Sequence, residues 1–341
     1  ILLISRKGQL KVNFIRTVDG DIKPEELGFT YAHEHIVCIP PYWKERNEDD
    51  LLLDDESKSL KDVMDFKKAG GNSIVDATAV DYGRDVKAVK RISQKTGVKI
   101  IATAGFNKSF LWDAKLKDNL KPVVGNYETY GEWIEKATVN ELAQYVISEI
   151  EEGLEGTNIR GGQLKFGTGY NSISPLEVKT IKAVAIAHKE TKAPIHSHTE
   201  AGTMALEQIE LLKKEGVNLE RVSFGHMDRN LDPYYHVQIA KTGAFLCFDG
   251  IGKIKYAPES DRINQIIYLV KQGFKDQILI SGDTARKSYY KHYNHGLGLE
   301  YIIKKWVPRF IDEADKAGLD GESLIKDFFI NNPMRCFAFQ D

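Results

Sequence analysis

The sequence predicts an α/β protein with the fold of a (β/α)8 barrel, also called a TIM barrel. Eight short apolar segments recur along the 341 residues, and a polar or amphipathic stretch follows each of them. Segments of this length that are rich in Ile, Val, Phe and Ala are typical of parallel strands with both faces buried. The main alternative is a doubly wound open sheet, but no Gly-x-Gly-x-x-Gly follows any of the segments. Barrels of this size form one unit, so we expect a single domain over residues 1–341.

Strands and helices are expected to alternate, with turn signals between them. The eight expected strands are Phe29–His35, Ser73–Thr78, Lys99–Gly105, Gly162–Gly167, Ala193–Thr199, Arg221–His226, Ala244–Asp249 and Gln277–Asp283. The expected helices are Ser59–Ala69, Arg84–Thr96, Asn140–Glu152, Leu176–Thr191, Met204–Glu215, Pro233–Lys241 and Asp261–Gly273, with further helices in the tail, Glu300–Phe329. Ser174-Pro175 is a helix start signal, and stop signals stand at Gly70, Gly97 and Gly216.

Two connections are expected to be long loops at the catalytic end of the barrel. Tyr42–Asp55 is acidic and aromatic and follows the first strand, and residues 106–139 form a long insertion after the third. Barrel enzymes place their chemistry in the loops at this end of the strands. We therefore expect the insertion to act as a lid or a substrate loop.

Composition argues against several classes of function. Lys and Arg total 47 and Asp and Glu total 49, so the net charge of −2 predicts neither a nucleic-acid-binding nor a membrane-binding surface. No apolar run approaches the roughly 20 residues that span a bilayer. The cysteines, Cys38, Cys247 and Cys336, are too far apart for a disulfide framework or a zinc finger. We therefore expect a cytoplasmic protein in a reducing compartment.

The stretch His33-Glu34-His35 is the first candidate site. Side chains alternate along a strand, so both imidazoles are expected on one face and Glu34 on the other. Two imidazoles in this arrangement suit a borderline divalent metal such as zinc. The competing interpretation is a pair of ordinary histidines in a polar turn.

Four further candidates lie on later strands, toward the end where barrel enzymes act. Lys165 lies within the fourth strand, and His198, His226 and Asp283 lie at or near the ends of the fifth, sixth and eighth. Three of them have a structural alternative: an ion pair for Lys165, a satisfied polar residue for His226 and a helix cap for Asp283. A buried ammonium without a partner is costly, so Lys165 is the hardest of them to explain structurally.

The remaining histidines are expected to be structural. His196 faces the same way as His198 but lies about 6.6 Å deeper along the strand, so we expect a packed, hydrogen-bonded core residue. The others are expected on the surface or in loops: His188, His236, His292 and His295.

Six of these residues resemble, in order and strand placement, the metal motif of the phosphotriesterase family in the amidohydrolase superfamily: His33, His35, Lys165, His198, His226 and Asp283. The resemblance implies two divalent metal ions, commonly Zn²⁺, that share a bridging hydroxide. It places His33, His35 and Asp283 on the more buried ion. It places His198 and His226 on the more exposed ion. Lys165, carboxylated by CO2, would bridge the two, and Asp283 would also take the proton in catalysis.

The loops after the seventh and eighth strands resemble the branch of that family that hydrolyses phosphorylated sugar lactones. In that branch a lysine, an arginine and a tyrosine grip the phosphate, and Lys255, Arg286 and Tyr289 match them. Arginine offers a fork of donors, lysine a point charge and tyrosine a hydroxyl. Lys253 and Lys287 are neighbours that could take these roles, and two solvated basic loops remain the alternative.

The sequence therefore predicts a metal-dependent hydrolase that opens a lactone ring, with a phosphorylated five-carbon sugar 1,4-lactone as substrate and the bridging hydroxide as nucleophile. Gly105-Phe106-Asn107 departs from the Gly-x-Tyr pattern of better-known lactonases in this family, which disfavours long-chain acyl lactones. The alternatives are an organophosphate or carboxylic ester hydrolase with the same metals, and a non-catalytic binding barrel. The resemblance also suggests a homodimer.

Overall fold

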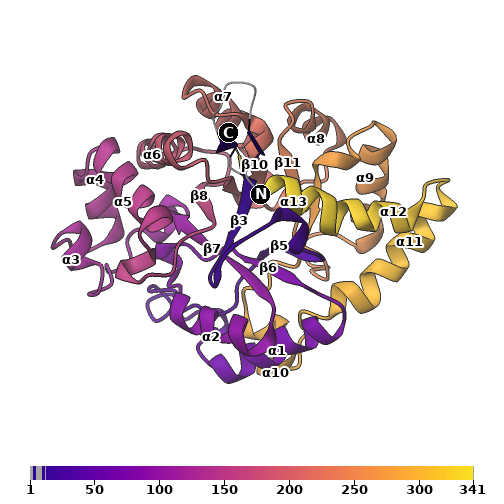
Figure 1. Cartoon of the computed structure of the whole chain (residues 1–341), viewed down its shortest axis with the longest axis horizontal. Helices are drawn as coiled ribbons and strands as arrows, with labels where there is room; N and C mark the ends of the chain where they lie inside the picture. The colour runs from indigo at the N-terminus through magenta and orange to yellow at the C-terminus, as the bar shows by residue number, and fades with distance from the viewer. Residues whose placement is uncertain (1–2, 5–9, 12, 341) are drawn as a thin grey trace.

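Eight parallel strands, β5 to β12, form the barrel at the centre of the structure (Figure 1). The computed structural model describes residues 3–4, 10–11 and 13–340. Neighbouring strands follow the order of the sequence, and the ladders between them are parallel. The strands are β5 (Thr30–Glu34), β6 (Ser73–Asp76), β7 (Lys99–Gly105), β8 (Gln163–Thr168), β9 (Ile195–Thr199), β10 (Val222–Phe224), β11 (Phe245–Phe248) and β12 (Ile278–Ile280). Each overlaps a predicted strand, so the predicted (β/α)8 barrel is confirmed.

Hydrogen bonds at the C-terminal ends of β5 and β12 join the two edges of the sheet. The N–H of Asp283 donates to the carbonyl of His33 (3.0 Å), and the N–H of His33 donates to Oγ of Ser281 (2.9 Å). The buried carboxylate of Glu34 accepts hydrogen bonds from Oγ of Ser281 (2.8 Å) and the N–H of Thr284 (2.7 Å). Glu34 therefore helps to close the barrel. It lies on the face of β5 opposite to the two histidines, as the alternation of side chains along the strand predicted.

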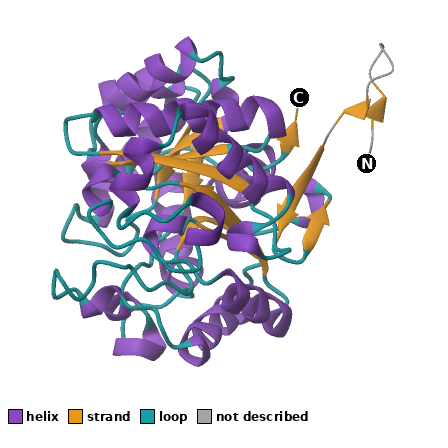
Figure 2. Cartoon of the chain, turned by 90° about the vertical axis from the view of Figure 1, so that its left-hand side faces the viewer, coloured by secondary structure: helices purple, strands orange, loops and turns teal. Residues whose placement is uncertain are grey.

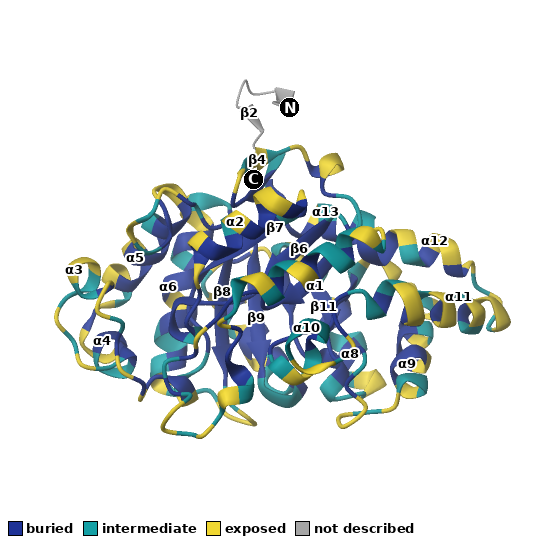
Figure 3. Cartoon of the chain, turned by 90° about the horizontal axis from the view of Figure 1, so that it is seen from below, coloured by how far each residue is buried: buried dark blue, intermediate teal, exposed yellow. Residues whose placement is uncertain are grey.

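Helices cover the outside of the barrel, with buried inner faces and exposed outer faces (Figure 3). Helix α6 (Pro175–Thr191) begins at the predicted signal, where Oγ of Ser174 accepts the N–H of Glu177 (3.2 Å). Helix α2 (Val86–Thr96) ends at Gly97, whose φ of 68° is the left-handed conformation that glycine favours. The other long helices are α1 (Glu56–Lys68), α5 (Val139–Glu151), α7 (Ala205–Lys214), α8 (Pro233–Ala240), α9 (Glu259–Lys271) and α11 (Val307–Lys316). None of the described helices has both the length and the apolar character needed to cross a membrane.

The segment after β7 that we predicted as a long loop contains regular structure. It includes α3 (Lys121–Val124) and α4 (Tyr130–Lys136). Oγ1 of Thr129 caps α4 by accepting the N–H of Glu132 (3.1 Å). The helix buries Trp133 and other apolar side chains. Tertiary packing of this kind stabilises helices that are too short to show in the sequence pattern, so the predicted long loop is helical in part.

A small antiparallel sheet that the sequence analysis missed lies at the base of the barrel (Figure 2). Strand β3 (Asn13–Thr17) pairs with β4 (Gly20–Ile22) and with β13 (Phe339–Gln340) from the other end of the chain. A Cβ atom on Gly162, just before β8, would lie 2.2 Å from the carbonyl oxygen of Arg16, so glycine is required where β3 crosses the barrel. Strands of two to five residues give too little alternation to be predicted.

Replacing Ser174 by alanine removes the hydroxyl that caps α6. Loss of an N-cap of this kind costs about 0.5–2 kcal/mol, so Ser174→Ala should lower the urea midpoint of unfolding. Ser323→Ala is the matched control, because Ser323 is an exposed serine within helix α12 (Gly321–Lys326) and its removal should leave the midpoint unchanged. Equal midpoints for Ser174→Ala and the wild type would contradict the assigned role of the cap.

Candidate metal centre

The side chains predicted to bind metal converge at the C-terminal end of the barrel. All six line one cavity of about 210 Å3, and all six are buried. They come from five strands or from the residues that directly follow them: His33, His35, Lys165, His198, His226 and Asp283. The structure therefore brings together every residue of the predicted metal site.

One cluster suits the more buried of two metal ions. The Nε2 atoms of His33 and His35 lie 3.7 and 3.5 Å from Oδ1 of Asp283. Each residue offers one ligand atom, and the three atoms lie within 4.8 Å of one another. Imidazole nitrogen with carboxylate oxygen is a donor set that zinc and similar ions accept. These three residues could therefore hold one divalent ion.

A second pair of histidines adjoins this cluster. Nδ1 of His198 and Nε2 of His226 lie 2.8 Å apart. Lys165 lines the same cavity, and its Nζ donates to the carbonyl of Ala77 (2.7 Å). Burial lowers the pKa of Lys165 to about 8, which increases the share of neutral amine, the form that reacts with CO2. Burial also lowers the pKa values of His198 and His226, and neutral imidazole is the form that binds metal.

Hydrogen bonds at the opposite ring nitrogens determine which nitrogen faces the cavity. Oδ1 of Asp249 lies 2.8 Å from Nδ1 of His226, and Oδ2 lies 3.1 Å from Nδ1 of His33. Oγ1 of Thr78 lies 2.8 Å from Nδ1 of His35. Outer partners of this kind fix the tautomer and the orientation of a metal-binding histidine. Asp249 with His33 and His226 also forms a possible ligand group, but its contacts with both Nδ1 atoms identify it as an anchor.

The other buried histidines are held by protein groups. Both ring nitrogens of His196 are hydrogen-bonded: Nδ1 lies 2.8 Å from Oγ of Ser223, and Nε2 lies 2.9 Å from Nδ1 of His33. The prediction of a hydrogen-bonded core residue is therefore confirmed. The surface placement predicted for His188 and His236 was wrong, because both are buried. They lie on inward faces of α6 and α8, where a backbone carbonyl satisfies each ring. His292 is half-buried and His295 is exposed.

Two cations hold the oxygen of Asp283 that faces away from the histidines. Nη2 of Arg229 and Nζ of Lys253 each lie 2.7 Å from Oδ2, and Lys253 also donates to the carbonyl of Asp283 (2.6 Å). Burial alone would raise the pKa of Asp283, but Lys253 and the neighbouring histidines hold it well below its ordinary value. Lys253, considered above as a phosphate ligand, is thus engaged at the metal centre.

The residues predicted to bind phosphate lie at one side of the cavity. Arg286 and Tyr289 line it, whereas Lys255 is exposed, with its Nζ 5.3 Å from the centroid of the Tyr289 ring. Arg286 also approaches the acidic loop after β5, with Nη2 3.3 Å from Oε2 of Glu48. Lys287, the other alternative, faces Asp54 (3.7 Å) instead. The three predicted residues therefore lie near one another, with Lys255 at the rim.

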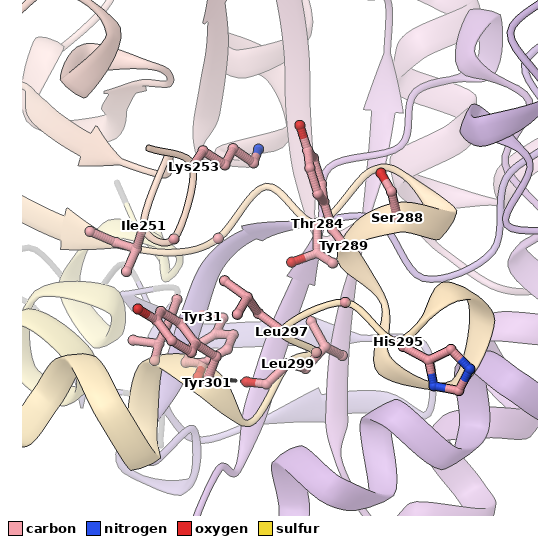
Figure 4. Close-up of a pocket in the computed structure, with 15 residues that line it drawn as sticks. Tyr31, Ile251, Lys253, Thr284, Ser288, Tyr289, His295, Leu297, Leu299 and Tyr301 are labelled. Carbon is pink, nitrogen blue, oxygen red and sulfur yellow. Dashed lines mark hydrogen bonds between the residues drawn. The ribbon is translucent and has the colours of Figure 1, made fainter. Parts of the chain in front are cut away.

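A second cavity of about 280 Å3 lies behind Tyr289 and Lys253 (Figure 4). Its lining is largely apolar and includes Ile251, Leu297 and Leu299. None of the six predicted metal ligands, all of which the structure describes, lines this cavity. Tyr289 and Lys253 line both cavities and so lie between the apolar cavity and the candidate metal centre.

A model of the phosphotriesterase family matches residues 13–337 of the chain. The chain belongs to the phosphotriesterase family. The resemblance drawn from the metal motif is thereby confirmed, and so is the prediction of a hydrolase, since the relatives named below include lactonases of this family.

Two relatives and one solved structure place the chain within the phosphotriesterase family. The phospho-furanose lactonase of Mycoplasmopsis synoviae strain 53 is 33% identical, over 96% of this chain and 92% of that protein. The phosphotriesterase homology protein of Escherichia coli K12 is 32% identical, over 92% of this chain and 99% of that protein. The crystal structure of a lactonase from Listeria monocytogenes has a TM-score of 0.95 at 69% identity, covering 96% of this chain and 100% of that one.

Sequence reasoning missed several residues of this phosphotriesterase-family site. Asp249 ends the seventh predicted strand, and Glu200 follows His198 by two residues. Considering every polar residue at the C-terminal end of a predicted strand could therefore have found both. No such signal marks Lys108 or Arg46, which reach the cavity from loops after β7 and β5. Their place depends on contacts between segments far apart in the chain.

Asp249→Asn should weaken metal binding by about 10–100-fold. An asparagine side chain has one acceptor oxygen and cannot hold Nδ1–H groups of both His33 and His226. Zinc-buffered equilibrium dialysis measures the change. Asp261→Asn, which alters an exposed carboxylate on α9, is the matched control and should bind metal as the wild type does. Unchanged affinity in Asp249→Asn would refute the anchoring role.

Proposed function

We propose that this phosphotriesterase-family hydrolase is a lactonase that opens the ring of a phosphorylated five-carbon sugar 1,4-lactone. The observation that carries the proposal is a ligand set for two divalent ions in the same cavity as Arg286 and Tyr289. The names of the relatives from Mycoplasmopsis synoviae and Listeria monocytogenes, a phospho-furanose lactonase and a lactonase, support it.

The donor set fits a pair of Zn²⁺ ions. His33, His35 and Asp283 would hold one ion, and His198 and His226 the other. Lys165 would bridge them after its neutral amine adds CO2 and releases a proton, because the resulting carbamate shares one negative charge between two oxygens that can each bind an ion. When bound, the ions would supply an activated water as nucleophile and polarise the lactone carbonyl.

Asp283 would move the proton during ring opening. Arg229 and Lys253 hold Oδ2, so Oδ1 is the oxygen that faces the histidines and the cavity. Oδ1 would take the proton of the attacking water and return it to the ring oxygen as the bond between that oxygen and the carbonyl carbon breaks. The product is an open-chain hydroxy acid that contains all the atoms of the water and the lactone. Proton transfer of this kind contributes about 10²–10⁴-fold.

The walls of the cavity favour a polar substrate. Beside the proposed metal ligands, the cavity is lined by polar and charged side chains, including those of Asn107, Arg46 and Arg229. Sugar hydroxyls can form hydrogen bonds with such side chains, whereas an alkyl chain cannot. Arg286, Tyr289 and Lys255 would grip the phosphate, with the phosphate replacing Glu48 beside Arg286.

Asp283→Asn and Lys165→Ala should each lose at least about 100-fold in turnover after reconstitution with Zn²⁺ and bicarbonate. Asparagine cannot accept the proton, and alanine cannot form the carbamate. Proton release from an aldonolactone phosphate measures the rate. Lys213→Ala, at an exposed position on α7, is the control and should keep wild-type turnover. Full activity in either site variant would reject the mechanism.

Arg286→Ala should lower kcat/KM for a phosphorylated lactone by about 10–100-fold, the range of a lost hydrogen bond to a charged group. The same variant should leave the rate on the unphosphorylated lactone unchanged. Lys287→Ala should behave as the wild type on both substrates, because Lys287 faces Asp54. Equal rates on both substrates in the wild type would favour the alternative, an ester hydrolase that ignores the phosphate.

A further inference from the structure

Glu200 lies beside the metal centre, although neither the ligand set nor the proposed reaction uses it. It follows β9 directly and lines the cavity of the metal ligands. Its Oε2 lies 2.8 Å from Nε2 of His198. The other nitrogen of that ring, Nδ1, lies 2.8 Å from Nε2 of His226. Glu200 therefore holds His198 by the nitrogen that faces away from its partner ligand.

The backbone around Glu200 keeps the carboxylate in this position. The carbonyl of Glu200 accepts hydrogen bonds from the N–H (3.0 Å) and the hydroxyl (2.8 Å) of Thr203. The chain then turns against the next loop, where a Cβ atom on Gly202 would lie 3.0 Å from the carbonyl oxygen of His226. The turn that carries Glu200 thus packs on the residue that supplies the second ligand of the same metal site.

A cation from the insertion after β7 approaches the same ring nitrogen. Nζ of Lys108 pairs with Oε2 of Glu200 and lies 3.3 Å from Nε2 of His198. An ammonium can only donate, so Lys108 on its own would donate to Nε2 and leave the ring hydrogen on Nδ1, pointing at His226. A carboxylate accepts hydrogen bonds from both Lys108 and His198. With Glu200 present, the hydrogen stays on Nε2 and the lone pair of Nδ1 faces the cavity.

We propose that Glu200 is a positioning residue that keeps His198 in the tautomer able to bind the more exposed metal ion, against the competing donor Lys108. The inference rests on the two-metal centre proposed above. It makes the two metal sites unequal: Asp249, whose side chain is 0% exposed, anchors one ligand of each site, whereas Glu200, whose side chain is 32% exposed, anchors a ligand of the more exposed ion only. The more exposed ion then depends on a contact at the rim of the cavity that includes the insertion.

Counting bound metal tests this role directly. Wild type, Glu200→Ala, Glu200→Gln, Lys108→Met and the double variant Glu200→Ala/Lys108→Met would be loaded with Zn²⁺ and bicarbonate and dialysed against buffers of fixed free Zn²⁺. We expect two ions per wild-type chain. Glu200→Ala should weaken one site by about 10–100-fold and leave the other unchanged. Glu200→Gln keeps an acceptor oxygen and should fall between.

The lysine variants separate positioning from a general loss of structure. Lys108→Met should bind two ions as the wild type does, and the double variant should regain most of the affinity lost in Glu200→Ala, because no cation then competes for Nε2. Two wild-type sites in Glu200→Ala, equal weakening of both sites, or no recovery in the double variant would overturn the inference. Fewer than two ions in the wild type would instead refute the proposed metal centre. Circular dichroism checks that each variant is folded.

Discussion

Every imidazole at the mouth of the barrel must present one nitrogen to the cavity, and it can do so only if the protein holds the other. Asp249 meets this requirement for two rings at once, one from β5 and one that follows β10. Because each oxygen of this buried carboxylate contacts a different imidazole ring, the two candidate ligand clusters are tied to a single rigid group. Their separation is therefore a property of the packed core and does not depend on the loops.

The two faces of β5 have different roles: one contributes to the candidate metal site and the other to the closure of the barrel. One face carries His33 and His35 into the cavity. The other carries Glu34 into contact with the segment after β12, which also bears Asp283. A shift of the strand by one residue would exchange these faces, so the register of β5 fixes both the closure of the barrel and the position of the carboxylate opposite the histidines.

Regular periodicity explains what could be predicted from the sequence. Alternation along strands and the shared direction of parallel strands were enough to place the eight strands and to bring His198, His226 and Lys165 to one cavity. The contacts of Arg229, Lys108 and Lys253 involve loop conformations and distant partners, which no local pattern encodes. His188 and His236 were misplaced because a histidine on the inward face of a helix looks polar in the sequence, while a backbone carbonyl makes its burial favourable.

The pairing of β3 with β13 brings Phe14 and Phe339 into register beneath the barrel, on the side opposite the cavity. Positions more than 300 residues apart in the chain are thus neighbours in space. Fusion partners or a solid support attached at this base would leave the mouth of the barrel open to solvent.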